Sequence, residues 1–132
     1  MVLTAKFVRK QMVLLKSMLE NSSLEAARKG QDEVGKLLAA THRKETEIRE
    51  VAFTRFGGAW ITPTEELRSG VILYLHGGGY TCGDLAYAEG FGSVLAAECG
   101  IRVFAAAYRL APEDRYPAAV DDALEAYRYL LD

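Results

Sequence analysis

The stretch VILYLHGGGY, residues 71–80, decides the fold. Val71–Leu75 is an unbroken apolar run, which is typical of a strand buried on both faces of a parallel sheet. His76 and three consecutive glycines follow it directly. Glycine reaches backbone angles that are closed to other residues and places no Cβ beside the main chain. The strand is therefore predicted to end in a loop whose backbone can closely approach a ligand.

The chain beyond this loop alternates helix and strand. A helical stretch from about Leu85 to Glu98 is followed by Gly100, which is placed to end it. Ile101–Tyr108 is predicted to be a second buried strand, and Pro117 suits the first turn of a last helix. Strand, helix, strand, helix is the signature of a parallel α/β sheet. The apolar stripe of the last helix consists of Val120, Leu124, Tyr127 and Leu131.

The segment before residue 71 predicts a β-hairpin from about Glu47 to Pro63. We place its tight turn at Gly57-Gly58, because glycine adopts a positive φ without strain. Ala59–Thr62 then forms the returning strand, which Pro63 ends.

Residues from about Thr4 to Thr41 predict two amphipathic helices. Ser22 lies three residues before Glu25, the spacing of a capping box, and is the expected start of the second helix. Gly30 and Gly35 should make that helix less rigid than the first. The apolar positions are Val8, Met12, Leu15 and Leu19 in the first helix, and Leu24, Ala27, Val34 and Leu38 in the second.

Composition narrows the classes of function. The 132 residues are 50% hydrophobic and 26% charged, with a net charge of −2, which is typical of an ordinary globular chain. We expect no nucleic-acid partner, because a concentrated basic patch is lacking. We expect no membrane partner, since no apolar run approaches the roughly 20 residues that span a bilayer, and residues 1–19 make a poor signal peptide.

The cysteines and other metal-binding residue types point to no cofactor. Cys82 and Cys99 do not make a disulfide framework, so a reducing, cytoplasmic location is expected. No cluster of His, Cys, Asp and Glu has metal-ligand spacing, and we expect neither a metal nor an organic cofactor.

The triglycine loop suggests an oxyanion hole. Main-chain N–H groups of such a loop can be held near 3 Å from the negatively charged oxygen of an acyl-transfer intermediate. A flexible turn without a ligand is the alternative. A phosphate-binding loop is a third reading, but neither G-x-x-x-x-G-K-[ST] nor G-x-G-x-x-G is present. HGGG is an esterase loop pattern, which favours the oxyanion role.

Two further motifs follow in the order and spacing of one known family. Residues 108–113 read YRLAPE and residues 116–123 read YPAAVDDA. Together with HGGGY they resemble the hormone-sensitive-lipase-like branch of the α/β-hydrolases, which contains many bacterial carboxylesterases and acetyl esterases. The resemblance implies an α/β fold: the N-terminal part of an α/β-hydrolase sheet, a β-hairpin and then βαβα, preceded by two cap-like helices and incomplete.

The resemblance also implies how the chain is divided. Residues 1–45 correspond to a helical cap segment and residues 46–132 to a partial hydrolase core. The four strands are expected to lie in the order first, second, fourth, third.

Site residues carry over from the family one by one. Gly78 and Gly79 match the glycines whose N–H groups form two-thirds of the oxyanion hole. His76 and Gly77 match residues that shape the loop. Tyr80 either lines an acyl pocket or simply packs.

Three charged residues match supporting positions. We infer that Arg109, Glu113 and Asp121 brace the loop after the second parallel strand. For Arg109 and Asp121 an ion pair that holds two segments together is favoured over a chemical role. For His76 a hydrogen-bonded loop position is favoured over catalysis, since a catalytic histidine needs an adjacent nucleophile and an orienting carboxylate.

The family's catalytic triad does not match residues 1–132. The nucleophile elbow G-x-S-x-G does not occur, and Ser93 has Phe91 and Leu95 at the two positions where the elbow has glycine. The histidines are His42, in a charged stretch, and His76. Cys82 is a weak substitute nucleophile, because the nearby Asp84 works against thiolate formation.

We therefore expect a fragment of a carboxylic-ester hydrolase that acts on short acyl esters. It carries the oxyanion loop but not the Ser-Asp/Glu-His triad, and is predicted to be inactive alone. The alternative is a short non-catalytic interaction or structural module derived from half a hydrolase. Because Val71–Leu75 would then lie at a sheet edge, we expect a homo-oligomer or association with the missing C-terminal part.

Overall fold

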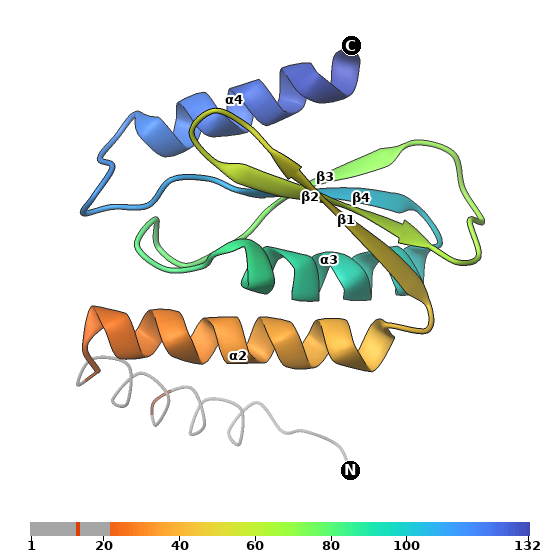
Figure 1. Ribbon diagram of the computed structural model, residues 1–132, viewed down its shortest axis with the longest axis horizontal. Helices are drawn as coiled ribbons and strands as arrows, with labels where there is room; N and C mark the ends of the chain where they lie inside the picture. Colours follow the sequence, from red (N-terminus) through yellow and green to blue (C-terminus); the bar gives the residue numbers. More distant parts are fainter. Residues whose placement is uncertain (1–12, 14–21) are drawn as a thin grey trace.

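The computed structural model describes residue 13 and residues 22–132, and these stack in layers (Figure 1). Helix α4 (Ala118–Leu131) covers one face of a sheet, and α3 (Leu85–Cys99) covers the other. Helix α2 (Leu24–His42) packs on the outer side of α3. The first predicted helix lies, apart from residue 13, outside the described residues.

The sheet has four strands: β1 (Thr46–Ala52), β2 (Gly57–Pro63), β3 (Val71–Leu75) and β4 (Arg102–Ala107). Their order is β1-β2-β4-β3, which confirms the predicted order. The β1–β2 and β2–β4 pairs are antiparallel, and the β3–β4 pair is parallel. The observed elements confirm a partial α/β-hydrolase fold, with β3 at the edge.

The predicted position of the hairpin turn, at Gly57-Gly58, is wrong. Gly57 and Gly58 begin strand β2 and pair with Ala52 and Val51, so the turn is formed by residues 53–56. It is closed by the Phe53 N–H donating to the Phe56 carbonyl at 3.0 Å, with the two rings stacked at 4.3 Å. Gly58 is needed for another reason, since a Cβ there would lie 2.7 Å from the Phe104 ring.

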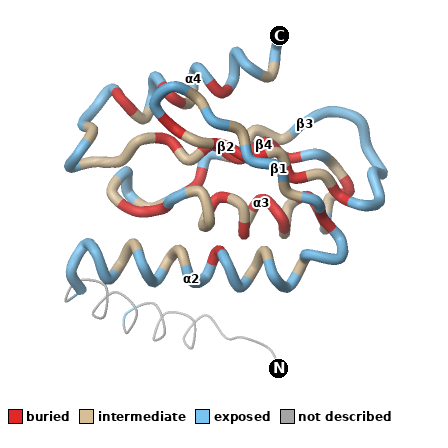
Figure 2. The backbone as a smooth tube through the Cα atoms, viewed as in Figure 1, coloured by how far each residue is buried: buried red, intermediate tan, exposed pale blue. Residues whose placement is uncertain are grey.

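Strand β4 carries the core on both faces. Val103 and Ala105 pack with Ile61 against α3, while Phe104 and Ala106 pack with Ala126 of α4. Alternate residues of a strand point to opposite faces, so a central apolar strand supports a helix on each side. Figure 2 shows the buried residues gathered in β2, β4 and α3.

Helix α2 begins one residue later than predicted and packs through only part of the predicted apolar face. Ser23 is the cap, and its side chain accepts from the Ala26 N–H at 3.2 Å. Leu24 and Val34, expected on that face, are exposed, whereas the other two predicted residues are half-buried. Gly35 is the buried residue of the helix, and a Cβ there would lie 2.3 Å from a backbone oxygen of α3. The glycine that seemed to weaken α2 is what lets the two helices touch.

Helix α4 exposes most of its apolar stripe. Small or polar residues, Ala118, Asp122 and Ala126, face the sheet at i, i+4 and i+8. The four stripe residues are 42–67% exposed. Both ends of the edge strand β3 are also exposed, at 36% for Val71 and 44% for Leu75. Between α4 and β3 the apolar surface is therefore open. No helix of the described part is long and apolar enough to cross a bilayer.

Candidate active site

The glycine loop joins β3 to α3 and is shaped around Gly78. Its φ of +140° belongs to a region that side-chain-bearing residues rarely adopt, and a Cβ would lie 2.0 Å from the Cys82 carbonyl oxygen. The N–H groups of Thr81 and Cys82 donate to the Gly78 carbonyl at 3.2 and 3.1 Å. Gly79 and Tyr80 follow with φ of +62°. The loop thus turns sharply at the position where only glycine fits.

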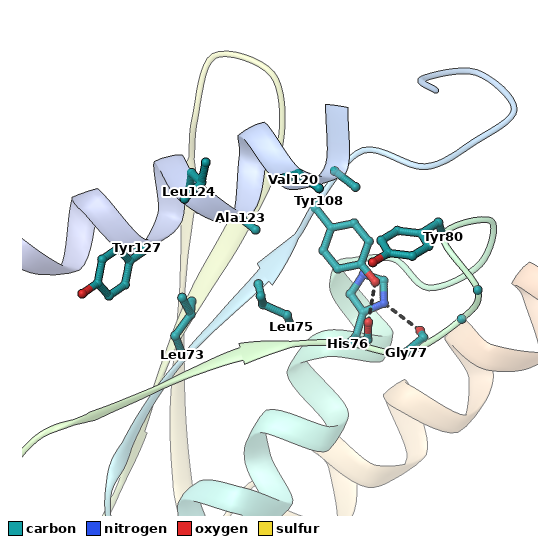
Figure 3. A pocket seen from close by; sticks show the side chains of 13 residues that line it. Leu73, Leu75, His76, Gly77, Tyr80, Tyr108, Val120, Ala123, Leu124 and Tyr127 are labelled. Carbon is teal, nitrogen blue, oxygen red and sulfur yellow. Dashed lines mark hydrogen bonds between the residues drawn. The ribbon is translucent and has the colours of Figure 1, made fainter. Parts of the chain in front are cut away.

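His76 is buried and supports this loop through its ring and its backbone carbonyl. It is 3% exposed, and its ring stacks on Tyr108 with centroids 4.2 Å apart and an interplanar angle of 7°. The Tyr108 hydroxyl donates to the His76 carbonyl (Figure 3). The Nδ1 atom of His76 lies 2.9 Å from the Gly77 carbonyl, an acceptor only, so Nδ1 carries the proton. Burial lowers the pKa of His76 and raises that of Tyr108.

These bonds orient the amides of Gly78 and Gly79. In a trans peptide the C=O and the following N–H point in opposite directions within one plane, and the cis peptides of the structure lie elsewhere. His76 holds the Gly77 carbonyl and so fixes the Gly78 N–H. The Gly78 carbonyl is likewise held, which fixes the Gly79 N–H. In the described part of the chain no group accepts from these two amides.

A cavity of about 600 Å³ lies beside the loop, between α4 and the edge strand β3. Figure 3 shows apolar side chains of α4 facing those of β3 across it, with His76, Tyr80 and Tyr108 at one end. Tyr80 is 63% exposed and also borders a neighbouring cavity of about 330 Å³. The first cavity is lined by Leu73, Leu75, His76, Gly77, Gly78, Gly79, Tyr80, Tyr108, Ala119, Val120, Ala123, Leu124 and Tyr127.

Arg109 pairs with Asp122, not with Asp121 as expected. Its backbone N–H donates to Asp122 Oδ2 at 2.8 Å, and its Nη2 donates to Oδ1 at 2.7 Å. Asp122 is 1% exposed, while Asp121 is exposed. The reason is helical phase, since Asp122 shares the sheet-facing side of α4 with Ala118 and Ala126. The pair fixes α4 to the end of β4.

Glu113 is bound by a residue that the sequence did not single out. The Arg28 guanidinium of α2 contacts both of its carboxylate oxygens, at 2.7 and 2.8 Å. Arg28 holds the pKa of Glu113 well below its usual range, at about 2. Eighty-five positions separate the two residues, so no local pattern could have revealed the contact.

The remaining candidate groups are not arranged for chemistry. Ser93 is fully buried and donates to the Glu89 carbonyl of its own helix at 2.8 Å. His42 Nδ1 lies 2.9 Å from the Leu38 carbonyl. Cys82 and Cys99 are free thiols. Within the described residues, no group of three His, Cys, Asp or Glu side chains is placed to hold a metal ion.

The comparison with protein families agrees with this geometry. Residues 72–132 match a family model described as the alpha/beta hydrolase fold. The solved structure of the esterase EstE5, soaked with p-nitrophenyl butyrate, superposes with a TM-score of 0.71 over 91% of this chain at 31% identity. The chain belongs to the α/β-hydrolase family. It falls in the hormone-sensitive-lipase-like branch, as the resemblance implied.

Two curated relatives of this chain are named as an ethyl acetate hydrolase and an acetyl-hydrolase. The ethyl acetate hydrolase of Pseudomonas putida is 47% identical over 66 residues, which is 50% of this chain and 21% of that protein. The acetyl-hydrolase of Streptomyces hygroscopicus is 34% identical over 111 residues, 70% of this chain and 37% of that protein. The match to EstE5 covers 42% of that chain. The hydrolase segment thus spans less than half the length of these relatives.

Proposed function

We propose that residues 1–132 form the oxyanion-hole segment of a carboxylic-ester hydrolase for short acyl chains. The observation that carries this proposal is that two backbone N–H groups beside the cavity are held in a fixed orientation without a hydrogen-bond acceptor among the described residues. The N–H groups of Gly78 and Gly79 have no acceptor in the described chain, are each fixed through the carbonyl of their peptide plane, and border a cavity. Donors held in advance in this way are what a developing oxyanion requires.

The reaction we propose is acyl transfer through a serine supplied from outside residues 1–132. A histidine, also supplied from outside residues 1–132, takes the proton of the serine hydroxyl as the serine oxygen bonds to the ester carbonyl carbon, and the π-electron pair of the carbonyl moves onto the carbonyl oxygen. Gly78 and Gly79 donate to this oxyanion, each donor lowering the barrier by about 3 kcal/mol. The carbonyl re-forms as the C–O bond to the alcohol breaks, and the same histidine gives its proton to the leaving oxygen. Water then attacks the acyl-serine while the histidine takes a proton from it, and the acid leaves as the serine regains its proton. His76 has no part in this proton transfer, because it is 3% exposed with its ring stacked on Tyr108, and its Nδ1–H is bound to a backbone carbonyl instead of an orienting carboxylate.

The substrate class follows from the cavity and the relatives. The lining on the α4 and β3 side is aliphatic or aromatic, with Leu73, Leu75 and Val120 among its members. Such a wall suits an acyl chain and offers no charged partner for a larger polar group. The names of the relatives, ethyl acetate hydrolase and acetyl-hydrolase, support a short acyl group.

The coding DNA beyond codon 132 tests the proposal. We expect an in-frame continuation that encodes G-x-S-x-G and later an Asp or Glu and a His. The extended protein should hydrolyse p-nitrophenyl acetate, its elbow Ser→Ala variant should not, and residues 1–132 alone should stay at background. A stop codon directly after codon 132 would contradict the esterase role.

The second candidate function is a non-catalytic interaction module, and the open edge of the sheet favours it. Leu75 of β3 and Leu124 of α4 are 44% and 47% exposed on the same cavity. An uncharged apolar edge strand readily pairs with another chain. We propose that this face is covered either by a second copy or by the rest of a hydrolase fold.

The two free cysteines support a reducing, cytoplasmic setting.

A further inference from the structure

Arg28 connects helix α2 to the glycine loop through several hydrogen bonds. Its Nε donates to the Thr81 carbonyl at 2.8 Å and its Nη2 to the Ala111 carbonyl at 3.0 Å. The same guanidinium grips both oxygens of Glu113. One side chain of the outer helix thus joins the loop after β3 to the loop after β4.

The two loops are also bonded to each other at this point. The Ala111 N–H donates to the Tyr80 carbonyl at 2.8 Å. Arg28 therefore fixes the carbonyl of Thr81 and that of Ala111 on either side of an existing loop-to-loop bond. Glu113 neutralises the guanidinium and holds its plane, and its low pKa, about 2, shows that it stays ionised at neutral pH.

The effect of Arg28 reaches an oxyanion donor through Thr81. The backbone N–H of Thr81 donates to the Gly78 carbonyl, and its hydroxyl lies 3.3 Å from the same oxygen. The Gly78 carbonyl shares a rigid peptide plane with the Gly79 N–H. Holding Thr81 in place thus determines where the Gly79 N–H points.

We propose that Arg28 is a positioning residue of the oxyanion loop, which orients the Gly79 amide through Thr81 and Gly78. The inference rests on the proposed function for its catalytic meaning. It gives helix α2 a role besides packing on α3, because the helix holds the loop from the side away from the cavity. Only a guanidinium does this, since its planar fork reaches two carbonyls and a carboxylate at once, whereas an ammonium is a single point donor.

Amide hydrogen exchange and NMR spectra of the 132-residue chain test the proposal. The variants are Arg28→Gln and Arg28→Lys, and the matched control is Lys29→Gln, which removes the same charge from the exposed neighbour on the helix. In both Arg28 variants we expect the Cys82 amide, which donates to the Gly78 carbonyl, to exchange about tenfold faster or more. The Gly79 resonance should also shift, with neither change in the control.

The amide of Phe104, in the central strand β4, reports whether each variant is folded. Unchanged exchange at Cys82 and an unshifted Gly79 resonance in Arg28→Gln, with Phe104 still protected, would overturn the proposal. If Arg28→Gln unfolds, Arg28→Lys decides, and wild-type behaviour at Cys82 and Gly79 in that variant would overturn it equally. A role limited to docking α2 would alter amides of that helix only. Because the readout does not involve hydrolysis, failure here leaves the esterase proposal intact, and a stop codon after codon 132 leaves the exchange result intact.

Discussion

Replacing the three loop glycines by alanine, one at a time, separates strain from mere flexibility. Gly77 lies outside the left-handed region, and a Cβ there would meet nothing within 4 Å. Gly79 has φ of +62° with open space around it, while Gly78 has φ of +140° and a Cys82 oxygen 2.0 Å from the new Cβ. The three glycines lie in one loop and differ in φ and in the space available to a Cβ.

The expected losses of unfolding free energy follow in that order. Gly77→Ala should change stability by less than about 0.5 kcal/mol. Gly79→Ala should cost about 1–2 kcal/mol for a left-handed alanine. Gly78→Ala combines an unfavourable φ, about 1–3 kcal/mol, with a backbone clash that adds about 1–3 kcal/mol. That is a large share of the roughly 5–15 kcal/mol that holds a domain folded.

Guanidinium chloride unfolding, followed by the fluorescence of Trp60, measures these differences. Trp60 is the single tryptophan and packs against Phe104 in the core, away from the substituted loop. All variants must be compared at one protein concentration, because self-association would add to the apparent stability. Equal losses for Gly77→Ala and Gly78→Ala would refute the view that the loop is shaped by a steric requirement at Gly78.

Three further predictions concern other parts of the molecule. Asp122→Asn should lower the unfolding free energy by about 2 kcal/mol or more in denaturant titrations, because it weakens the charge-assisted hydrogen bonds between Arg109 and a buried carboxylate. Asp121→Asn, at the exposed neighbour, should change the unfolding free energy by less than about 0.5 kcal/mol. Burial, with nearby carboxylates, raises the pKa of Glu89 to about 7. Its contribution to stability is therefore complete below about pH 4.5 and lost as the pH rises through 7. Glu89→Gln should flatten this fall in thermal unfolding scans and stabilise the protein at pH 7.5 by on the order of 1 kcal/mol; an unchanged pH profile would contradict this. In sedimentation experiments at micromolar concentration the chain should self-associate through β3, and Leu75→Lys should prevent this while Tyr116→Lys should not; a stable wild-type monomer would argue against the edge as a self-association site.

The arrangement of the sheet could be predicted because its signals are local and strong. Val71–Leu75 and Val103–Ala107 are unbroken apolar runs. Gly100 ends α3 in the left-handed conformation, and its N–H donates to the Ala96 carbonyl. The strand order came from the family resemblance of the motifs, which fix the connections. The glycine loop was likewise evident from its composition alone.

Other features depend on contacts that no local pattern encodes. The hairpin turn follows from the stacking of Phe53 on Phe56, whereas Gly57-Gly58 was the stronger local signal. To tell whether Asp121 or Asp122 faces the sheet, one must know how α4 is rotated about its axis. A shift of one residue in that assignment exchanges the two. Arg28 had no signal, because its partners lie 53 to 85 positions away.

The hydrogen bonds that shape the glycine loop all come from groups outside β3 and α4. His76 holds the Gly77 carbonyl, Thr81 and Cys82 hold the Gly78 carbonyl, and Tyr108 holds the carbonyl of His76. Arg28 donates a further hydrogen bond to the Thr81 carbonyl. None of these groups belongs to β3 or to α4, the elements that border the open side of the cavity. The donor half of the proposed site can therefore be set by the folding of residues 22–132 alone, and a segment that covers the open side would meet amides that are already in position, with no cost of reorganisation at the moment of reaction.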